Sequence, residues 1–241
     1  MTPPLLSLQG VHTHIGAYHI LHGVDLVVPR GELTMLLGRN GAGKTTTLRT
    51  IMGLWQASQG RITLGSEDIT AQSTPAIAQK NIAYVPENMG IFSDLTVKEN
   101  MLLAARSARR AEQMDAARLA WIFKLFPAVE KFWNHPAGKL SGGQKQMLAV
   151  ARAIVEPRDL LIIDEPSKGL APAIIQNMIE AFQQLKASGV TILLVEQNMH
   201  FAQQLGDSVA VMDNGRVVHA GRMQDLAEDT ALQQSLLGLA L

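Results

Sequence analysis

Residues 34–52, TMLLGRNGAGKTTTLRTIM, decide the fold expected for this chain. An apolar strand at Thr34–Leu37 leads into Gly38–Thr45, which fits the phosphate-binding pattern G-x-x-x-x-G-K-[ST] in full. A helix expected over Lys44–Met52 follows directly. Because strand, glycine-rich loop and helix occur in this order, a phosphate-binding loop is favoured over a purely structural glycine turn.

The loop predicts a cradle for nucleotide phosphates. Its glycines let backbone N–H groups point at phosphate oxygens, and the start of the helix adds partial positive charge. Lys44 is expected to pair with the β- and γ-phosphates, and the Thr45 hydroxyl is expected to bind Mg²⁺. The residues expected to contact the nucleotide are Gly38, Arg39, Asn40, Gly41, Ala42, Gly43, Lys44, Thr45 and Thr46.

The rest of the chain predicts an α/β fold with a parallel sheet. Short apolar runs separated by helical stretches are typical of buried parallel strands. These runs are Leu33–Leu37, Ile82–Val85, Leu160–Ile163 and Val190–Val195. Leu5–Val11 and Ile20–Val28 are expected to form antiparallel strands, and Asp213-Asn214-Gly215 a hairpin turn between Val209–Met212 and Arg216–His219.

The character of the sequence changes between about residues 88 and 157. Thr96-Val97-Lys98-Glu99 is a capping-box pattern that begins a helix, and Ala- and Arg-rich helices follow to about Phe126. We interpret this region as a helical lobe inserted into the α/β core. The tail from Arg222 is expected to be a packing helix.

Two carboxylates follow the apolar run Leu160–Ile163. The carboxyl end of a parallel strand is where α/β sheets place their ligands. Asp164 is expected to hold Mg²⁺ through water, and Glu165 to accept a proton from the water that attacks the γ-phosphate. An Asp-Glu pair after a strand is more often a solvated turn, but the phosphate loop upstream favours the catalytic interpretation.

Composition narrows the possible partners and chemistries. The 241 residues contain 21 Lys plus Arg and 21 Asp plus Glu, which argues against nucleic acid or an anionic membrane surface as the main partner. The chain contains no Cys, which excludes disulfides, thiolate catalysis and zinc–thiolate sites. Its apolar runs are far shorter than the roughly 20 residues of a membrane span, so a membrane role requires a partner.

A second glycine-containing motif identifies a family. Leu140-Ser141-Gly142-Gly143-Gln144 precedes the acidic strand and matches the LSGGQ signature of ABC ATPases. Signature, phosphate loop and acidic pair occur in that family's order and spacing, so the chain resembles ABC ATPases over essentially its whole length. The resemblance implies a P-loop NTPase parallel-sheet core, an N-terminal antiparallel β sub-lobe and an inserted helical sub-lobe. It also implies one ABC ATPase domain over residues 1–241, with the core at about 1–87 and 158–221, the helical sub-lobe at about 88–157 and the helical tail at 222–241.

The signature also predicts an anion site from its chemistry. Ser141 and two glycines at a helix start offer a hydroxyl, bare N–H groups and a positive helix end, although an ordinary Ser/Gly helix start has the same residues. In ABC ATPases the signature of one subunit closes over the nucleotide of the other. The resemblance therefore implies that Ser141, Gly142, Gly143 and Gln144 act in trans, in a head-to-tail pair that binds ATP and Mg²⁺.

Three further segments resemble one branch of the family. Val85-Pro86-Glu87, Glu165–Pro172 and Leu194–Asn198 look like the subunits that energise branched-chain (hydrophobic) amino acid importers, and urea and amide importers resemble the same branch. This implies a second ABC ATPase (a homologue or another copy), two transmembrane permease subunits and, indirectly, a substrate-binding protein. It also implies a peripheral position on the cytoplasmic face of the inner or plasma membrane. A soluble ATPase of a cytosolic assembly, and a clamp that binds ATP with little hydrolysis, remain as alternatives.

The chain departs from the common family pattern at identifiable positions. Glu87 stands where Gln is usual and would bring negative charge near phosphate unless Mg²⁺ or water intervenes, so it is a candidate metal ligand. Gln197 stands where a switch His is usual and can donate a hydrogen bond to the γ-phosphate but cannot shuttle a proton. Glu165 is therefore expected to supply the base without help, and Ala171 replaces a usual Asp.

Four smaller features complete the expectations. The family spacing places the adenine contact at Ile15, with Tyr18 as the nearest aromatic residue and His14 as another stacking candidate. His12, His14, His19 and His22 are interpreted as surface or packing residues rather than a metal site. Arg106, Arg109 and Arg110 are expected on a solvated helix face. Met89, Ile91 and Phe92 in the loop Asn88–Leu95 are expected to dock a membrane partner, with local packing as the alternative.

Overall fold

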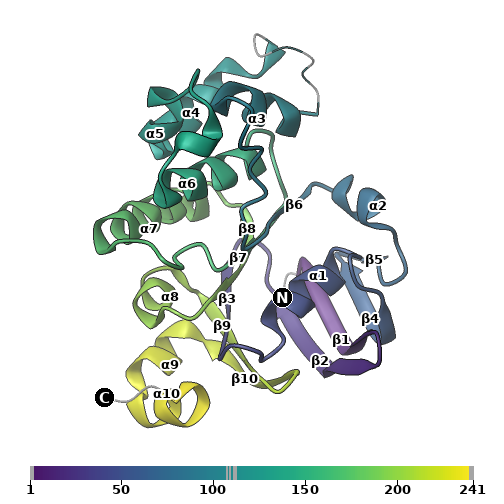
Figure 1. The fold of residues 1–241 in the computed structure, drawn as a ribbon. Coiled ribbons are helices and arrows are strands. Elements are labelled where there is room, and N and C mark those ends of the chain that lie inside the picture. The colour runs from purple at the N-terminus through teal and green to yellow at the C-terminus, as the bar shows by residue number, and fades with distance from the viewer. Residues whose placement is uncertain (1–2, 107, 109, 111–112, 239–241) are drawn as a thin grey trace.

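The computed structural model describes residues 3–106, 108, 110 and 113–238. Its larger sheet has the strand order β10-β9-β3-β8-β7-β6, and all of these strands except β10 run parallel (Figure 1). The strands are β3 (Leu33–Gly38), β6 (Ile82–Val85), β7 (Leu160–Asp164), β8 (Thr191–Glu196), β9 (Ser208–Asp213) and β10 (Arg216–Arg222). Every residue of β3, β7 and β8 is buried, which explains their continuous apolar sequences.

A second, antiparallel sheet has the order β2-β1-β4-β5 and lies at the lower right of Figure 1. Its strands are β1 (Leu6–Ile15), β2 (Tyr18–Val28), β4 (Ala57–Leu64) and β5 (Glu67–Asp68). The strands expected at Leu5–Val11 and Ile20–Val28 are confirmed but are longer than expected. The sequence did not predict β4, because its first five residues are polar or small and Gly60 lies within it.

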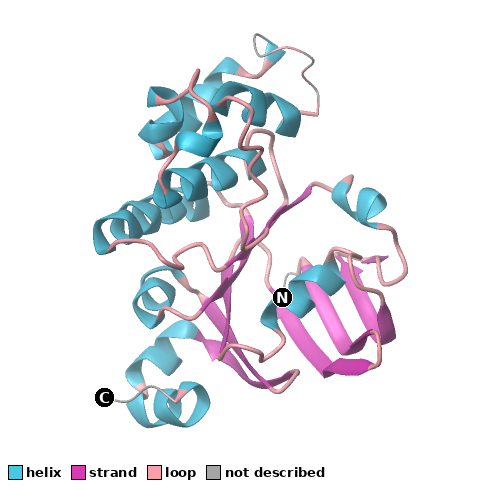
Figure 2. Ribbon diagram, in the orientation of Figure 1, coloured by secondary structure: helices cyan, strands magenta, loops and turns pink. Residues whose placement is uncertain are grey.

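Helices cover the parallel sheet and form a separate lobe, at the top of Figures 1 and 2. The helices of the core are α1 (Lys44–Ile51), α2 (Thr74–Ala78), α7 (Pro172–Ala187), α8 (Met199–Leu205), α9 (Met223–Glu228) and α10 (Thr230–Leu237). Those of the lobe are α3 (Val97–Ala104), α4 (Ala116–Leu125), α5 (Pro127–Lys131), a 3₁₀ turn (Ala137–Lys139) and α6 (Gly142–Ala153). The capping box at Thr96 and Glu99 is present at the start of α3, as expected.

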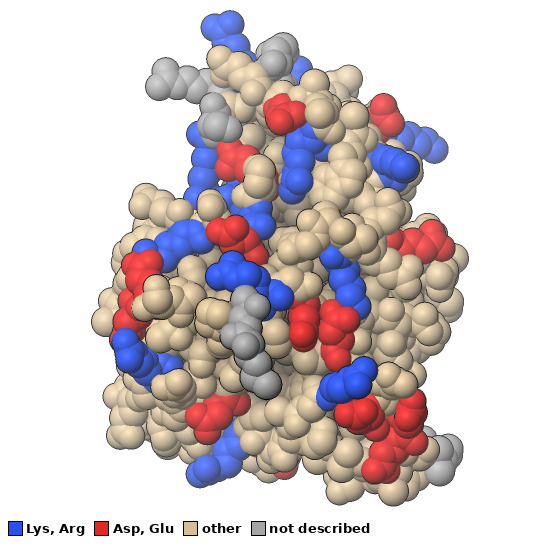
Figure 3. Space-filling model, turned by 180° about the vertical axis from the view of Figure 1, so that it is seen from behind, with Lys and Arg blue, Asp and Glu red and all other residues tan. Residues whose placement is uncertain are grey.

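The surface carries both signs of charge. On the face seen in Figure 3, Lys and Arg side chains are interspersed with Asp and Glu. This agrees with the equal numbers of basic and acidic residues in the sequence. Within the described residues, no helix has the length and apolar character that crossing a membrane requires.

Candidate nucleotide-binding site

The phosphate loop joins the end of β3 to the start of α1. Gly38 and Gly43 have φ values of 151° and 102°, in the region that favours glycine. A Cβ at Gly38 would lie 2.4 Å from the carbonyl oxygen of Met212, so the loop also approaches β9 too closely for a side chain. This tight turn directs the start of α1 towards the carboxyl edge of the parallel sheet.

Lys44 is held across the loop rather than extended into solvent. Its Nζ donates hydrogen bonds to the carbonyl oxygens of Gly38 (2.8 Å) and Arg39 (3.1 Å). The same nitrogen lies 3.5 Å from Oε1 of Glu165, and the Lys44 side chain is only 4% exposed. The expected phosphate-binding cation and the expected base therefore lie side by side.

Asp164, at the end of β7, faces Thr45. The Thr45 hydroxyl donates to Oδ1 of Asp164 (3.2 Å), and burial raises the pKa of Asp164 to about 6. Its second oxygen, Oδ2, is buried and has no hydrogen-bond partner among the described residues. A buried carboxylate oxygen without a partner, beside a hydroxyl, is a donor set that suits Mg²⁺.

Glu165 and Gln197 meet above the loop from the ends of β7 and β8. Nε2 of Gln197 donates to Oε1 of Glu165 (2.6 Å) and to Oδ1 of Asn40 (2.7 Å). Glu165 has a φ of 47°, a backbone conformation that non-glycine residues rarely adopt and that is common at functional sites. The Gln197 amide thus connects the expected base to the phosphate loop.

Residues of the phosphate loop and of the strand ends line a cavity of about 370 Å³. Its lining includes Lys44, Thr45, Glu87, Glu165 and Lys168. Glu87 is paired with Lys168. Sequence reasoning missed Lys168, because no local pattern places a cation from the loop after β7 next to a carboxylate from the loop after β6.

A second missed residue is Glu196, the last residue of β8. It is 2% exposed, and its carboxylate accepts hydrogen bonds from the backbone N–H groups of Ser167 (2.8 Å), Gln197 (3.1 Å) and Asn198 (3.3 Å). Burial raises its pKa. Glu196 therefore fixes the loops that carry Lys168 and Gln197, and a charge ending an apolar strand is the sequence signal that could have identified it.

The candidates for the adenine contact, Ile15, Tyr18 and His14, lie on the β1–β2 pair beside the phosphate loop and stay a prediction. Tyr18 is 76% exposed and pairs across the strands with Ile15. Among the described residues, the lining of the cavity includes Ile20 of β2 but not Ile15, Tyr18 or His14. A bulge between β1 and β2 shifts the register here, which spacing alone does not reveal.

The signature lies in the helical lobe, at the start of α6. Ser141 and Gln144 form a reciprocal capping box, and Ser141 and Gly142 are exposed. The described residues that line the cavity do not include Ser141, Gly142, Gly143 or Gln144. The fold therefore presents the phosphate loop and the signature as two separate surfaces of one chain.

The sequence also contains a cluster of histidines and a cluster of arginines. Four histidines cluster on the β1–β2 pair: the rings of His14 and His19 stack with centroids 4.1 Å apart, and the tilted rings of His19 and His22 have centroids 4.0 Å apart. Among the described residues, no group of three His, Cys, Asp or Glu side chains is placed to hold a metal ion. The helix face expected for the basic cluster is not formed, because Arg106 lies in a turn and Arg110 in a bend between α3 and α4. Arg106 lines a groove beside the lobe, and Arg109 lies outside the described residues.

Comparison with known proteins agrees with this geometry. The family described as ABC transporter matches residues 21–168. The chain belongs to the ABC transporter family. This ABC chain is 39% identical to the high-affinity branched-chain amino acid transport ATP-binding protein BraG of Pseudomonas aeruginosa, over 97% of the chain and 100% of that protein. It is 34% identical to a probable branched-chain amino acid transport ATP-binding protein, LivF, of Archaeoglobus fulgidus, over 92% and 93% of the two chains.

Solved structures show the same fold. The ATP-binding subunit of an ABC transporter superposes on this ABC chain with a TM-score of 0.79, at 32% identity over 95% and 94% of the two chains. An ATP-binding cassette in its ADP conformation gives a TM-score of 0.80, at 25% identity over 97% and 98%. The expected α/β cassette is thereby confirmed. As an ABC ATP-binding domain, the chain binds ATP and hydrolyses it to drive transport.

Proposed function

We propose that this ABC ATPase energises a membrane importer for branched-chain or other hydrophobic amino acids. The observation that carries the proposal is its 39% identity to BraG along nearly all of both chains. The segments around Glu87, Glu165 and Gln197, which resemble the same branch, support it independently of overall identity. Urea and amide importers are the competing substrate class, because they share these motifs.

The geometry of the site supports a separate role for each of its residues in ATP hydrolysis. Lys44 and the loop N–H groups bind the phosphates, and Gln197 orients Glu165 through the 2.6 Å hydrogen bond. Glu165 takes the proton from the attacking water. Thr45 and Asp164 would hold Mg²⁺, with Glu87 as a further candidate ligand, and the ion would neutralise charge on the phosphate oxygens.

The exposed signature supports action as a pair. Ser141 and Gly142 offer a hydroxyl and N–H groups at the positive end of α6, outside the chain's own cavity. In the proposed cycle, ATP on the P-loop of one subunit is closed over by the signature of the other. Loss of the γ-phosphate then lets the pair reopen, so ATP shifts a two-state equilibrium.

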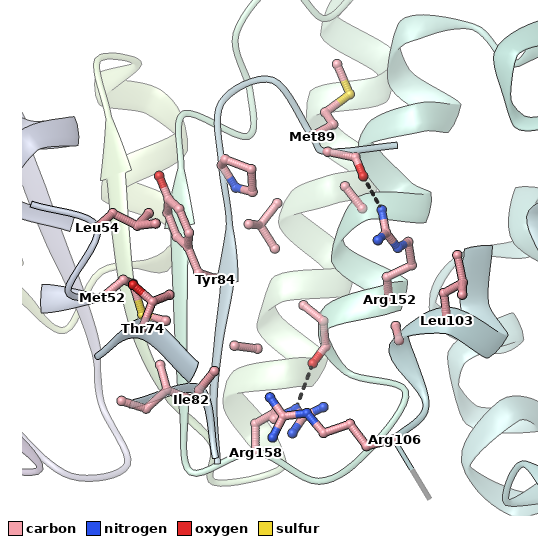
Figure 4. A pocket seen from close by; sticks show the side chains of 18 residues that line it. Met52, Leu54, Thr74, Ile82, Tyr84, Met89, Leu103, Arg106, Arg152 and Arg158 are labelled. Carbon is pink, nitrogen blue, oxygen red and sulfur yellow. Dashed lines mark hydrogen bonds between the residues drawn. The ribbon is translucent and has the colours of Figure 1, made fainter. Parts of the chain in front are cut away.

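A groove between the core and the helical lobe is the proposed contact with the permease subunits (Figure 4). It has a volume of about 430 Å³, and its lining includes Leu54 and Leu103, which are 48% and 59% exposed. Phe92 is 50% exposed beside it and lies under the guanidinium of Arg152, 5.2 Å from the ring centroid. Exposed apolar side chains around one groove are typical of a docking surface.

The proposal is tested by affinity isolation of the full chain from its own membranes in mild detergent, with identification of every co-purifying protein. We expect two polytopic membrane proteins and a second ABC ATPase. Recovery of soluble partners only would contradict the importer function and favour an assembly ATPase. Calorimetric titration of the associated substrate-binding protein with leucine and with urea then distinguishes the two substrate classes.

Phe92→Asp tests the groove within the same experiment. A carboxylate in place of the apolar ring should abolish recovery of the membrane subunits, because burying it at the contact costs desolvation free energy even where Arg152 lies beside it. ATP binding should be unchanged. Val218→Asp, at a side chain that is 49% exposed on β10, is the matched control. Recovery of the membrane subunits with Phe92→Asp would contradict docking at the groove.

A further inference from the structure

A charged bridge crosses the nucleotide cavity. Nζ of Lys168 lies 2.5 Å from Oε1 of Glu87 and 3.4 Å from Oε2 of Glu165. Glu87 comes from the segment after β6, whereas Glu165 and Lys168 come from the segment after β7. All three side chains line the same cavity as Lys44 and Thr45.

The two carboxylates present an electrostatic problem for a phosphate site. Glu87 and Glu165 both line the cavity that Lys44 and Thr45 line. Their negative charges would repel a nucleotide triphosphate bound there. The Glu87 side chain is 45% exposed, so Lys168 is the cation that lies against its carboxylate within the cavity.

We propose that Lys168 is a positioning residue that offsets the charge of Glu87 and thereby makes this cavity compatible with a triphosphate. The Lys168 ammonium donates a hydrogen bond to Glu87, which places a positive charge directly beside the acid. The contact with Glu165 places the same cation next to the expected base. The inference rests on the nucleotide-site roles proposed above and not on the importer function.

The effect belongs to nucleotide binding rather than to folding. Lys168 is 56% exposed, and exposed ion pairs contribute little to stability. An uncompensated carboxylate a few ångströms from a phosphate instead weakens binding by about fivefold, because the interaction between two unit charges at that distance is on the order of 1 kcal/mol even in water. Removing Lys168 and removing Glu87 should therefore have coupled effects.

The test is a double-mutant cycle read by direct binding of a fluorescent ATP analogue to the full chain, with and without Mg²⁺. Without Mg²⁺, where a metal-ligand role of Glu87 does not enter, we expect Lys168→Met to weaken binding about fivefold and Glu87→Gln added to Lys168→Met to restore it. The double variant should bind nearly as tightly as wild type. Lys168→Arg should retain binding because it keeps the charge, and unchanged thermal unfolding of each variant confirms that the fold is intact.

Each outcome of the cycle either supports or contradicts the compensation of Glu87 by Lys168. Wild-type affinity in Lys168→Met, or a double variant as weak as Lys168→Met, would overturn the compensation. Rescue in the double variant cannot arise from a structural role of Lys168 alone, because Glu87→Gln restores no packing around the lost side chain. Failure of wild type itself to bind the analogue would contradict the nucleotide site, which is a different result from loss of coupling.

Discussion

The side-chain amide nitrogen of Gln197 donates hydrogen bonds to two groups of the site. Nε2 is 2.7 Å from Oδ1 of Asn40 and 2.6 Å from Oε1 of Glu165. A neutral amide can orient the base and donate to a phosphate oxygen, but it cannot exchange a proton. Its contribution should therefore be to geometry at the reacting centre rather than to proton transfer or to ground-state binding.

Gln197→Ala should reduce the maximal rate of ATP hydrolysis by about 10- to 100-fold, because Glu165 loses the group that orients it. The affinity for ATP should change little. Steady-state hydrolysis and equilibrium binding, measured on the assembled complex, separate the two quantities. Gln197→His is the matched control and should retain most of the rate. A wild-type rate in Gln197→Ala would show that Glu165 needs no orientation from this side chain.

The residues that sequence reasoning identified share one property: each belongs to a local motif. Lys44 and Thr45 are the last two residues of the phosphate-loop motif, and Asp164 and Glu165 come at the end of an apolar strand. The adjacent residues in the sequence are therefore enough to identify all four. Lys168 and Glu196 act through contacts with segments far away in sequence. Such contacts depend on how the strand ends are placed in the sheet, which a local pattern does not encode.

At the scale of elements, the loop Asn88–Leu95 is held by one buried side chain of α3. Asn100 is fully buried, accepts from the N–H of Phe92 (3.1 Å) and donates to the carbonyl oxygens of Phe92 (2.9 Å) and Thr96 (3.0 Å). The sequence predicted the loop and the helix, but not the anchor between them. Asn100 therefore sets the position of Phe92 beside the groove.

Asn100→Ala should lower the free energy of unfolding by about 2 kcal/mol, because backbone groups of the loop lose their buried partners. Chemical denaturation measures this loss, and hydrogen exchange should show faster exchange at Phe92. Asn88→Ala, at an exposed position of the same loop, is the control and should change stability by less than about 0.5 kcal/mol. Equal stability of the two variants would contradict the anchoring role.

The histidine cluster on β1 and β2 predicts a pH dependence of this element. Nδ1 of His12 and Nε2 of His19 are 3.0 Å apart, at hydrogen-bonding distance. The pKa of His22 is lowered from 6.5 by desolvation first, and then by His19, Arg216, His12 and His14. Because the folded chain resists protonation of His22, the unfolded chain binds more protons as the pH falls below 6.5.

Wild type should therefore lose stability relative to His22→Gln as the pH falls from 7 through the window below 6.5. The difference between the two proteins should be constant at higher pH, where His22 is neutral in both states. Denaturation curves collected at steps between pH 8 and pH 5, with a chelator present, measure it. A difference that stays the same at every pH would contradict a lowered pKa of His22.

At the scale of the whole molecule, the separation of two surfaces determines how the chain can work. The cavity around Lys44 lies at the carboxyl edge of the parallel sheet, whereas Ser141 is exposed at the start of α6. Figure 1 shows α6 in the helical lobe and α1, which follows the phosphate loop, in the core. The family resemblance predicted a signature acting in trans. The fold is compatible with that arrangement, and the pair itself stays a prediction. On the face seen in Figure 3, basic and acidic side chains are interspersed, so neither sign of charge dominates that face.

The most direct test of the account is the rate of ATP hydrolysis by the isolated transporter complex carrying Glu165→Gln. The glutamine retains the hydrogen-bonding shape of Glu165 but cannot take a proton from the attacking water. We predict a rate at least about 100-fold below wild type, with ATP still bound by the complex. Hydrolysis at the wild-type rate would contradict the assignment of Glu165 as the base and the mechanism built on it.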